Sequence, residues 1–360
     1  VKLATMANSP HDSLRMLRLI KTSDLPMVGM CMGEMGTPSR ILGGRFGAPF
    51  TYATFHHERA LAPGQLSFQE MKDVYHYDAI NRETNVYAVI GDPIGHSLSP
   101  LVHNGAFRAE GINAVYIPFR VPKSQLKKFL TDAPLFGIRG LSVTIPHKET
   151  SLRVATKLDR AAREIGAVNT IVFENNGMTG YNTDCRAAMD SLAQATPAAA
   201  EEQGLAGRTC LVLGAGGAAR AICYGLKRRG ATVVIASRTR EKADKLADAL
   251  DCQAIDWSAR SNKSFDVLVN CTPVGMHPDV DASPFERHHL KPSHVVFDTV
   301  YNPETTLLLK NARSQSCKIV TGLEMFVRQA ALQFKLFTGH AAPVDLMRDT
   351  VRRAIGPAKY

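Results

Sequence analysis

The stretch Leu211-Val-Leu-Gly-Ala-Gly-Gly-Ala-Ala-Arg220 decides the fold, because an apolar strand runs directly into a glycine turn and then into a helix. A glycine after the strand permits a tight turn, and the next two let the backbone approach a pyrophosphate. Ala219 is small enough for the helix to pack closely on its strand, and the helix start offers free N–H groups to phosphate. The stretch predicts a dinucleotide-binding α/β domain with phosphate contacts at Gly214, Ala215, Gly216, Gly217 and Ala218.

The residues after the next expected strand, 232–236, indicate which dinucleotide binds. An acidic residue there would hold the ribose 2′-hydroxyl of NAD, whereas an arginine can hold the 2′-phosphate of NADP. No carboxylate occurs in 230–240, which instead contains Ser237-Arg238-Thr239-Arg240. The sequence therefore favours NADP, with Arg238 as the main phosphate ligand and Ser237, Thr239 and Arg240 in support. The alternative is a solvated basic loop without a ligand.

The composition is that of an ordinary globular protein of about two or three domains. Of the 360 residues, 45% are hydrophobic and 21% are charged. No apolar run approaches the roughly 18 to 20 residues that span a bilayer, and no signal-peptide pattern is present, so a cytoplasmic protein is expected. The seven cysteines lack C-x-x-C pairs and are expected to be reduced, mostly buried thiols.

The formal net charge of +10 raises the question of a polyanionic partner. The basic residues are spread along the chain without interleaved aromatic residues, and anionic small molecules account for the charge equally well. We expect no nucleic-acid or membrane partner, and a monomer or homodimer. His96 and His147 have no third ligand at metal-site spacing, so no metal is expected.

Residues 1–83 follow a βαβαβα pattern, with strands expected at 1–6, 27–32 and 50–55 and helices at 9–20 and from Ser67. This segment resembles the C-terminal third of type I 3-dehydroquinate dehydratase, a (βα)₈ barrel. The resemblance rests on three stretches: Val1-Lys2, Gly36-Thr-Pro-Ser-Arg40 and Ala62-Pro-Gly-Gln65. It implies a Schiff-base lysine at Lys2, a carboxylate clamp at Arg40 and a substrate contact at Gln65.

Two features of the segment depart from that family. Leu61 stands where a serine is common, and the catalytic histidine and the earlier barrel strands are missing. A parallel sheet that lacks about two-thirds of its strands cannot close into a barrel. No dehydratase activity is expected from this chain alone, and the alternative for Lys2 is an ordinary terminal lysine.

A second α/β domain is expected over 84–186, completed by 323–356. Its elements alternate through the chain: strands 86–90, 114–119, 140–144 and 170–173, and helices 100–111, 123–131 and from Lys148 to Ile165. The dinucleotide domain then covers 187–322, with further strands at 266–270 and 295–298. A helix from Gly322, with an apolar face at Leu323, Phe326, Val327, Ala330, Phe334 and Phe337, and a last helix at 344–355 follow.

Six separated motifs occur in order along 86–355: Ser97-Leu-Ser-Pro, Ser142-Val-Thr-Ile-Pro-His-Lys148, Gly166-Ala-Val-Asn-Thr170, Gly180-Tyr-Asn-Thr-Asp184, Val269-Asn-Cys-Thr-Pro-Val-Gly-Met276 and Gly322 to Ala330. Together they resemble shikimate dehydrogenase. A dehydratase followed by a dehydrogenase also resembles bifunctional fusions of the two enzymes. The fold class expected is a two-domain α/β protein with a substrate domain and a Rossmann NADP domain, preceded by a partial barrel.

The resemblance implies specific roles for polar residues. Lys148 would be the general acid/base and Asp184 would orient it. Ser97 and Ser99 would receive the substrate carboxylate, while Asn169, Asp184 and Gln329 would read ring hydroxyls. Thr144 would complete the substrate site and Tyr301 would touch both ligands, although a turn-packing tyrosine is the alternative. The coenzyme channel would be lined by Thr272, Val274, Met276 and Gly322.

The function expected is NADP-dependent, reversible reduction of 3-dehydroshikimate to shikimate, a step towards chorismate and the aromatic amino acids. Ser99, where a threonine could stand, favours shikimate over quinate. One alternative is a quinate or dual-specificity dehydrogenase that uses NAD. An alternative of another class is a ligand-binding regulatory module without turnover, against which intact Lys148 and Asp184 argue.

Overall fold

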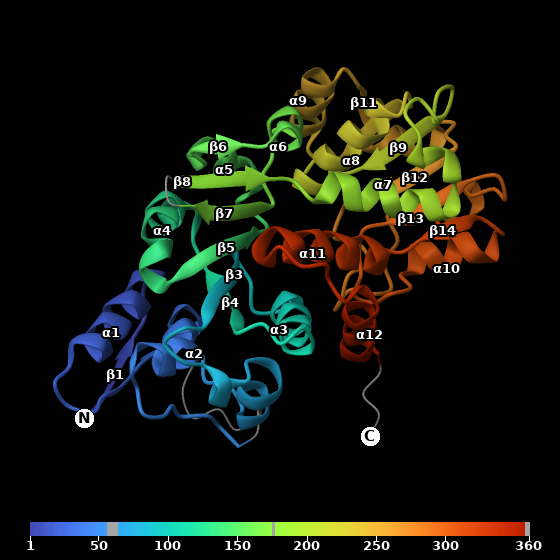
Figure 1. The fold of residues 1–360 in the computed structure, drawn as a ribbon. Helices are drawn as coiled ribbons and strands as arrows, with labels where there is room; N and C mark the ends of the chain where they lie inside the picture. The colour runs from blue at the N-terminus through green and yellow to red at the C-terminus, as the bar shows by residue number, and fades with distance from the viewer. Residues whose placement is uncertain (56–63, 175–176, 357–360) are drawn as a thin grey trace. The chain divides into compact units, whose positions relative to one another are not determined.

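The structure is a computed structural model that describes residues 1–55, 64–174 and 177–356, coloured from blue to red in Figure 1. These residues form two compact units. The first contains residues 1–159, 168–181 and 333–350, and the second contains 160–167, 182–332 and 351–356. None of the helices in the described ranges is long and apolar enough to cross a membrane.

The second unit is built on a six-stranded, fully parallel sheet (Figure 1). The strand order is β11-β10-β9-β12-β13-β14, the doubly wound order of dinucleotide-binding domains. The strands are β9 (Thr209–Leu213), β10 (Thr232–Ser237), β11 (Gln253–Asp256), β12 (Val267–Asn270), β13 (Val295–Asp298) and β14 (Lys318–Val320). Their near-continuous Val, Leu and Ile runs suit strands that are covered on both faces. The predicted Rossmann fold is confirmed.

Helices cover both faces of that sheet. One apolar cluster joins it to α7 (Asp184–Ala195), α8 (Gly217–Arg228) and α9 (Arg240–Leu250). A separate cluster on the other face includes Leu308 and Leu309 of α10 (Leu307–Ser314). Helix α8 stops before Gly230, whose φ of 82° suits a glycine after a helix end. The predicted strand, glycine turn and helix are therefore confirmed as one continuous unit.

The first unit contains a mixed six-stranded sheet in the order β4-β3-β5-β7-β8-β6. Strands β3, β4 and β5 are parallel, whereas β7 runs antiparallel to both β5 and β8. The strands are β3 (Asn85–Gly91), β4 (Ala114–Arg120), β5 (Ile138–Val143), β6 (Lys157–Leu158), β7 (Thr170–Glu174) and β8 (Gly177–Tyr181). Helices α3 (Ser99–Ala109) and α4 (Leu126–Asp132) connect the parallel strands, as the sequence predicts.

The single helix expected from Lys148 to Ile165 is wrong. The chain instead forms α5 (Lys148–Val154), the short strand β6 and α6 (Arg160–Ile165). Thr156 exchanges hydrogen bonds with the backbone of Met178, and β6 pairs in parallel with β8. This pairing with a strand some 20 residues away interrupts a sequence that is helical by local preference alone.

The N-terminal segment forms β1 (Lys2–Met6), α1 (Pro10–Thr22), β2 (Val28–Met32) and α2 (Thr37–Phe46), with β1 and β2 paired in parallel. The strand expected over 50–55 is wrong, because only Thr54 makes a single bridge, to Ser67. Phe50 and Phe55 are exposed, and no further strand pairs with this sheet within the described residues. After Ser67 the chain forms the predicted helical turns, as a π-helix over Glu70–Val74.

Helices α11 (Gly322–Thr338) and α12 (Val344–Ile355) match the predicted C-terminal helices. On the predicted apolar face of α11, Leu323, Val327, Ala330 and Phe334 are fully buried. Phe326 is half-buried and stacks on Tyr301 with ring centroids 4.5 Å apart. The apolar stripe therefore serves two purposes, core packing and support of a tyrosine that the sequence predicts at the site.

Candidate active site

The glycine loop of the second unit has the geometry of a phosphate site. Gly214 has a φ of 107°, and its N–H donates to Ala236 O at 2.8 Å, which places the loop beside the end of β10. Gly216 precedes α8 without a side-chain cap, and a Cβ there would meet nothing within 4 Å. Uncapped N–H groups at a helix start with open space in front of them suit a pyrophosphate.

The loop after β10 carries the predicted 2′-phosphate ligand. Arg238 is exposed and makes no hydrogen bond or ion pair with any described residue. Arg240, predicted to support it, instead pairs with Asp244 at 2.8 Å and Asp256 at 2.9 Å. Thr239 N–H donates to Ser237 Oγ at 3.4 Å, which folds the loop on itself. Arg238 is thus the arginine of this loop whose guanidinium pairs with no carboxylate among the described residues. The loop therefore fits the 2′-phosphate of NADP.

Two further loops follow β12 and β13. Thr272 and Val274 of the first are half-buried, and Met276 is exposed. Both loops are anchored on a buried pair that sequence reasoning missed, Asn270 and Asp298. Burial raises the pKa of Asp298 to about 6. The available signal was a polar residue ending each of two otherwise apolar strands.

In the first unit, the three segments with predicted substrate contacts, at 97–99, at 144–148 and at Asn169, meet at one end of the sheet. The 92–98 loop is joined to the 144–148 loop by Asp92 N–H, which donates to Ile145 O at 3.0 Å. Ser97 Oγ accepts from Ser99 N–H at 3.3 Å, at the start of the eleven-residue helix α3. Such a helix start favours a carboxylate, the group predicted to bind these serines.

Lys148 and Asn169 lie on segments bound to each other. Val168 N–H donates to Lys148 O at 2.9 Å, and Val143 N–H donates to Asn169 O at 2.7 Å. Thr144 packs at the end of β3, where a Cβ on Gly91 would lie 2.8 Å from its Cγ2. His147 is structural: it is buried, its Nε2 lies 2.6 Å from Val121 O, and burial lowers its pKa.

The remaining substrate-site predictions fall in the second unit. Asp184 begins α7 and is held by Asn182, whose Oδ1 accepts from Asp184 N–H at 3.0 Å. Asn182 in turn donates to Ala167 O at 2.9 Å, a link that the sequence did not reveal. Gln329 Nε2 donates to Phe326 O at 3.1 Å. Tyr301 stacks on that same Phe326, and burial raises its pKa.

The dehydratase-like residues are also placed. Lys2 lies on β1 with Nζ 4.1 Å from the centre of the Tyr52 ring. Arg40 is only 2% exposed, its Nε has no partner, and burial lowers its pKa. Gln65 lies in a loop, while Ala62 and Pro63 of the same motif, and Leu61, lie outside the described residues. A buried guanidinium without an acidic partner among the described residues suits an anionic ligand.

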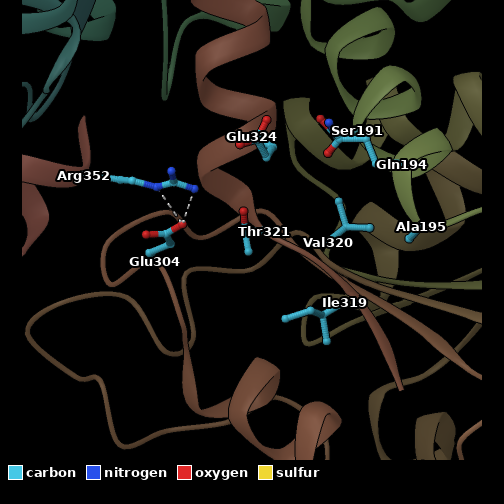
Figure 2. Close-up of a pocket in the computed structure, with 9 residues that line it drawn as sticks. All are labelled: Ser191, Gln194, Ala195, Glu304, Ile319, Val320, Thr321, Glu324 and Arg352. Carbon is cyan, nitrogen blue, oxygen red and sulfur yellow. Dashed lines mark hydrogen bonds and ion pairs between the residues drawn. The ribbon is translucent and has the colours of Figure 1, made fainter. Parts of the chain in front are cut away.

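A pocket of about 260 Å³ lies elsewhere in the second unit. Figure 2 shows Ser191 and Gln194 of α7 on one side and the Arg352–Glu304 ion pair, 3.3 Å, on the other. Thr321 and Glu324 complete the polar lining, and Thr321 precedes the predicted coenzyme contact Gly322. Its nine lining residues include none of the predicted ligands. No group of three or more potential metal ligands occurs within the described ranges.

Comparison with known families agrees with this geometry. Residues 89–171 match the shikimate dehydrogenase substrate binding domain, and residues 322–352 match the shikimate 5'-dehydrogenase C-terminal domain. Residues 209–301 match the family described as NADP oxidoreductase coenzyme F420-dependent. Residues 1–82 match type I 3-dehydroquinase.

Individual proteins give the same result. The bifunctional 3-dehydroquinate dehydratase/shikimate dehydrogenase of Arabidopsis thaliana is 39% identical over 96% of this chain, which spans 59% of that protein's length. The NADP⁺ shikimate dehydrogenase of Caldanaerobacter subterraneus is 39% identical, with 76% of this chain and 98% of that one covered. The shikimate 5-dehydrogenase structure from Thermus thermophilus with NADP(H) and shikimate superposes with a TM-score of 0.66, at 32% identity, covering 75% of this chain and 100% of that one.

The two lines of observation converge. A doubly wound sheet with a free arginine after β10 suits an NADP domain, and relatives that match this chain over nearly their whole length are shikimate dehydrogenases. The chain therefore belongs to the shikimate dehydrogenase family.

Proposed function

We propose that the chain catalyses the reversible, NADP-dependent reduction of 3-dehydroshikimate to shikimate. The observation that carries this proposal is the cluster of segments around Ser97, Thr144, Lys148 and Asn169, joined by backbone hydrogen bonds at one end of the first unit's sheet. Hydroxyl, amide and ammonium groups on a rigid sheet end suit a polyhydroxylated acid.

Reduction of a carbonyl requires a hydride and a proton. NADPH supplies the hydride when bound, so the chain must deliver the proton and hold the ring. We assign the proton to Lys148 Nζ, which would protonate the developing alkoxide and recover the proton from shikimate in the reverse direction. Ser97 and Ser99 would bind the carboxylate, and Thr144, Asn169 and Gln329 would bind ring hydroxyls. Tyr301 would touch both the substrate and the coenzyme.

The proposed coenzyme ligands divide into three groups. Gly214 to Ala218 would bind the pyrophosphate, and Ser237, Arg238 and Thr239 the 2′-phosphate. Thr272, Val274, Met276 and Gly322 would line the channel for the nicotinamide. These assignments place the coenzyme on residues 187–322 and the substrate mainly on 84–186 with 323–356. We propose no dehydratase step for this chain alone. Among the described residues of 1–82, β1 and β2 are the only strands that form a sheet, and two strands cannot close into a barrel.

Asp184→Asn should lower kcat and also raise the KM for shikimate. The carboxylate is proposed to bind a ring hydroxyl as well as to orient the lysine, and the amide keeps its size without the charge. Initial rates at varied shikimate test this. Asp190→Asn, on the same helix and half-exposed, is the matched control and should leave both constants unchanged. An Asp184→Asn variant with unchanged KM would remove the substrate contact from this residue.

The proposed function itself is tested by the oxidation of NADPH by 3-dehydroshikimate. The reaction is measured as the loss of absorbance of the reduced nicotinamide. Turnover supports an enzyme. Binding of both ligands by calorimetry without turnover would favour the non-catalytic regulatory module.

All seven cysteines are free thiols, and we therefore propose a reducing compartment such as the cytoplasm. We also propose that the protein is a monomer or a homodimer.

A further inference from the structure

Asn270 and Asp298 form a buried polar pair at the carboxyl ends of β12 and β13. They are register partners in that ladder, and both side chains are fully buried. Asn270 Nδ2 donates to Asp298 Oδ1 at 2.9 Å. A buried carboxylate is costly unless hydrogen bonds satisfy it, and here the bonds run to the two loops that follow the strands.

Asp298 fixes both ends of the second loop. Its Oδ1 also accepts from Val300 N–H at 3.0 Å, immediately before Tyr301. Its Oδ2 accepts from Thr306 Oγ1 at 2.6 Å. Thr306 is the N-cap of α10, and its Oγ1 accepts from Leu309 N–H at 3.3 Å. The carboxylate therefore sets the path of residues 299–306 from their first residue to their last.

Asn270 holds the start of the first loop. Its Oδ1 accepts from Thr272 N–H at 3.0 Å and from Thr272 Oγ1 at 2.7 Å. Its Nδ2 also donates to Val274 O at 3.3 Å. The two loops are then joined directly, because His277 N–H donates to Asn302 O at 3.0 Å. One amide–carboxylate pair therefore orders two loops that come from different strands.

Two glycines bring further segments against these loops. A Cβ on Gly214 would lie 3.0 Å from Cys271 O, and one on Gly322 would lie 2.3 Å from Val300 O. The second distance is too short for any side chain, so glycine is required at the start of α11. The glycine loop, the two loops held by the pair and the start of α11 thus adjoin one another within the second unit.

The strand order indicates which part of the coenzyme these loops face. Arg238 follows β10, the glycine loop follows β9, and the pair follows β12 and β13, on the opposite side of β9 from Arg238. A dinucleotide with its pyrophosphate at the glycine loop and its 2′-phosphate at Arg238 places its nicotinamide half over β12 and β13.

We propose that the Asn270–Asp298 pair positions the loops that receive the nicotinamide half of the coenzyme, with Asp298 as the central positioning residue. This inference rests on the proposed NADP function of the second unit. Neither side chain contacts the coenzyme, because both are fully buried and act through Thr272, Val274 and Val300. Their effect on binding must therefore be selective for the nicotinamide half.

Asp298→Leu removes the acceptors and keeps a similar size. It should raise the Kd for NADPH roughly tenfold or more, since several hydrogen bonds that order the loops are lost. The Kd for adenosine 2′,5′-bisphosphate, which lacks the nicotinamide half, should change by less than about twofold. Both constants are measured by calorimetry on the purified full chain. Asp298→Asn retains the Oδ1 acceptor and should bind NADPH more tightly than the leucine variant.

Asp266→Leu is the matched control. Asp266 is an aspartate of the same sheet that accepts from Thr209 N–H at 2.8 Å and Arg208 at 3.0 Å, at the amino ends of β9 and β12. Its loss should leave NADPH affinity within about twofold. If Asp298→Leu does not fold, Thr306→Val removes one hydrogen bond to the carboxylate. That variant should weaken NADPH roughly threefold and spare the bisphosphate.

Equal weakening of NADPH and the bisphosphate would show that the pair serves only the fold and would overturn the proposal. So would an Asp298→Leu variant, or in its place Thr306→Val, that binds NADPH as the wild type does. Failure of the proposed function looks different: the wild type itself would neither bind NADPH nor reduce 3-dehydroshikimate.

Discussion

Lys148→Ala should lower kcat by roughly 10² to 10⁴-fold, the usual contribution of a general acid/base residue. Proton transfer to the carbonyl oxygen accompanies hydride transfer, whereas ground-state binding is shared among many groups. The KM for shikimate should therefore change far less than kcat. Initial rates at saturating NADP⁺ measure both constants.

Coenzyme binding provides the internal check on that variant. Lys148 lies in the first unit, so the Kd for NADPH on the second unit's residues should be unchanged. Lys157→Ala, which removes an exposed ammonium from β6, is the matched control and should retain wild-type rates. If Lys148→Ala keeps more than about a tenth of the wild-type kcat, the loss is smaller than the range for acid/base catalysis. The proton would then come from another group, and Tyr301 or a water would be the next candidate.

Arg238→Ala should weaken NADPH binding roughly 10- to 100-fold, which corresponds to about 1.5 to 3 kcal/mol for a charge-assisted hydrogen bond. Affinity for NADH should hardly change, because only NADPH carries the 2′-phosphate. The structure sharpens this prediction: Arg240 is engaged by Asp244 and Asp256, so it cannot replace Arg238 without losing those ion pairs. Calorimetric titration with each coenzyme measures the ratio.

Lys245→Ala controls for net charge in the same experiment. It removes an exposed cation from α9, the helix that follows the Arg238 loop, and should leave both affinities unchanged. Equal weakening of NADPH and NADH by Arg238→Ala would exclude a 2′-phosphate contact. Loss of NADPH affinity in the lysine variant as well would point to long-range electrostatics rather than a direct bond.

The sequence was most informative where local patterns determine structure. Apolar runs bounded by turns predicted β9, β10, β12 and β13 of the second unit, and the glycine string predicted the turn and the helix α8 that follow β9. The predictions failed where the structure depends on strand pairing between residues that are far apart in the sequence. Thr156 adopts an extended path because Met178 bonds to it, and residues 50–55 form no strand because, among the described residues, their only pairing is the single bridge from Thr54 to Ser67.

The candidate site shows the same division. Lys148, Asn169 and Arg238 could be proposed from the sequence because each belongs to a short motif. Asn270 and Asp298 each looked like a strand terminus, and only the register of β12 against β13 makes them a pair. Asn182 was likewise missed, since its role depends on Ala167, fifteen residues earlier in the chain. Arg240 was predicted to face a phosphate, but β11 brings Asp256 to it.

The most direct test of the account is a comparison of kcat/KM for the purified chain across four pairings: shikimate or quinate with NADP⁺ or NAD⁺. Arg238 without a carboxylate partner and Ser99 at the start of α3 predict the highest value for shikimate with NADP⁺. A higher value for quinate with NAD⁺ would contradict the account and assign the chain to the quinate-oxidising alternative.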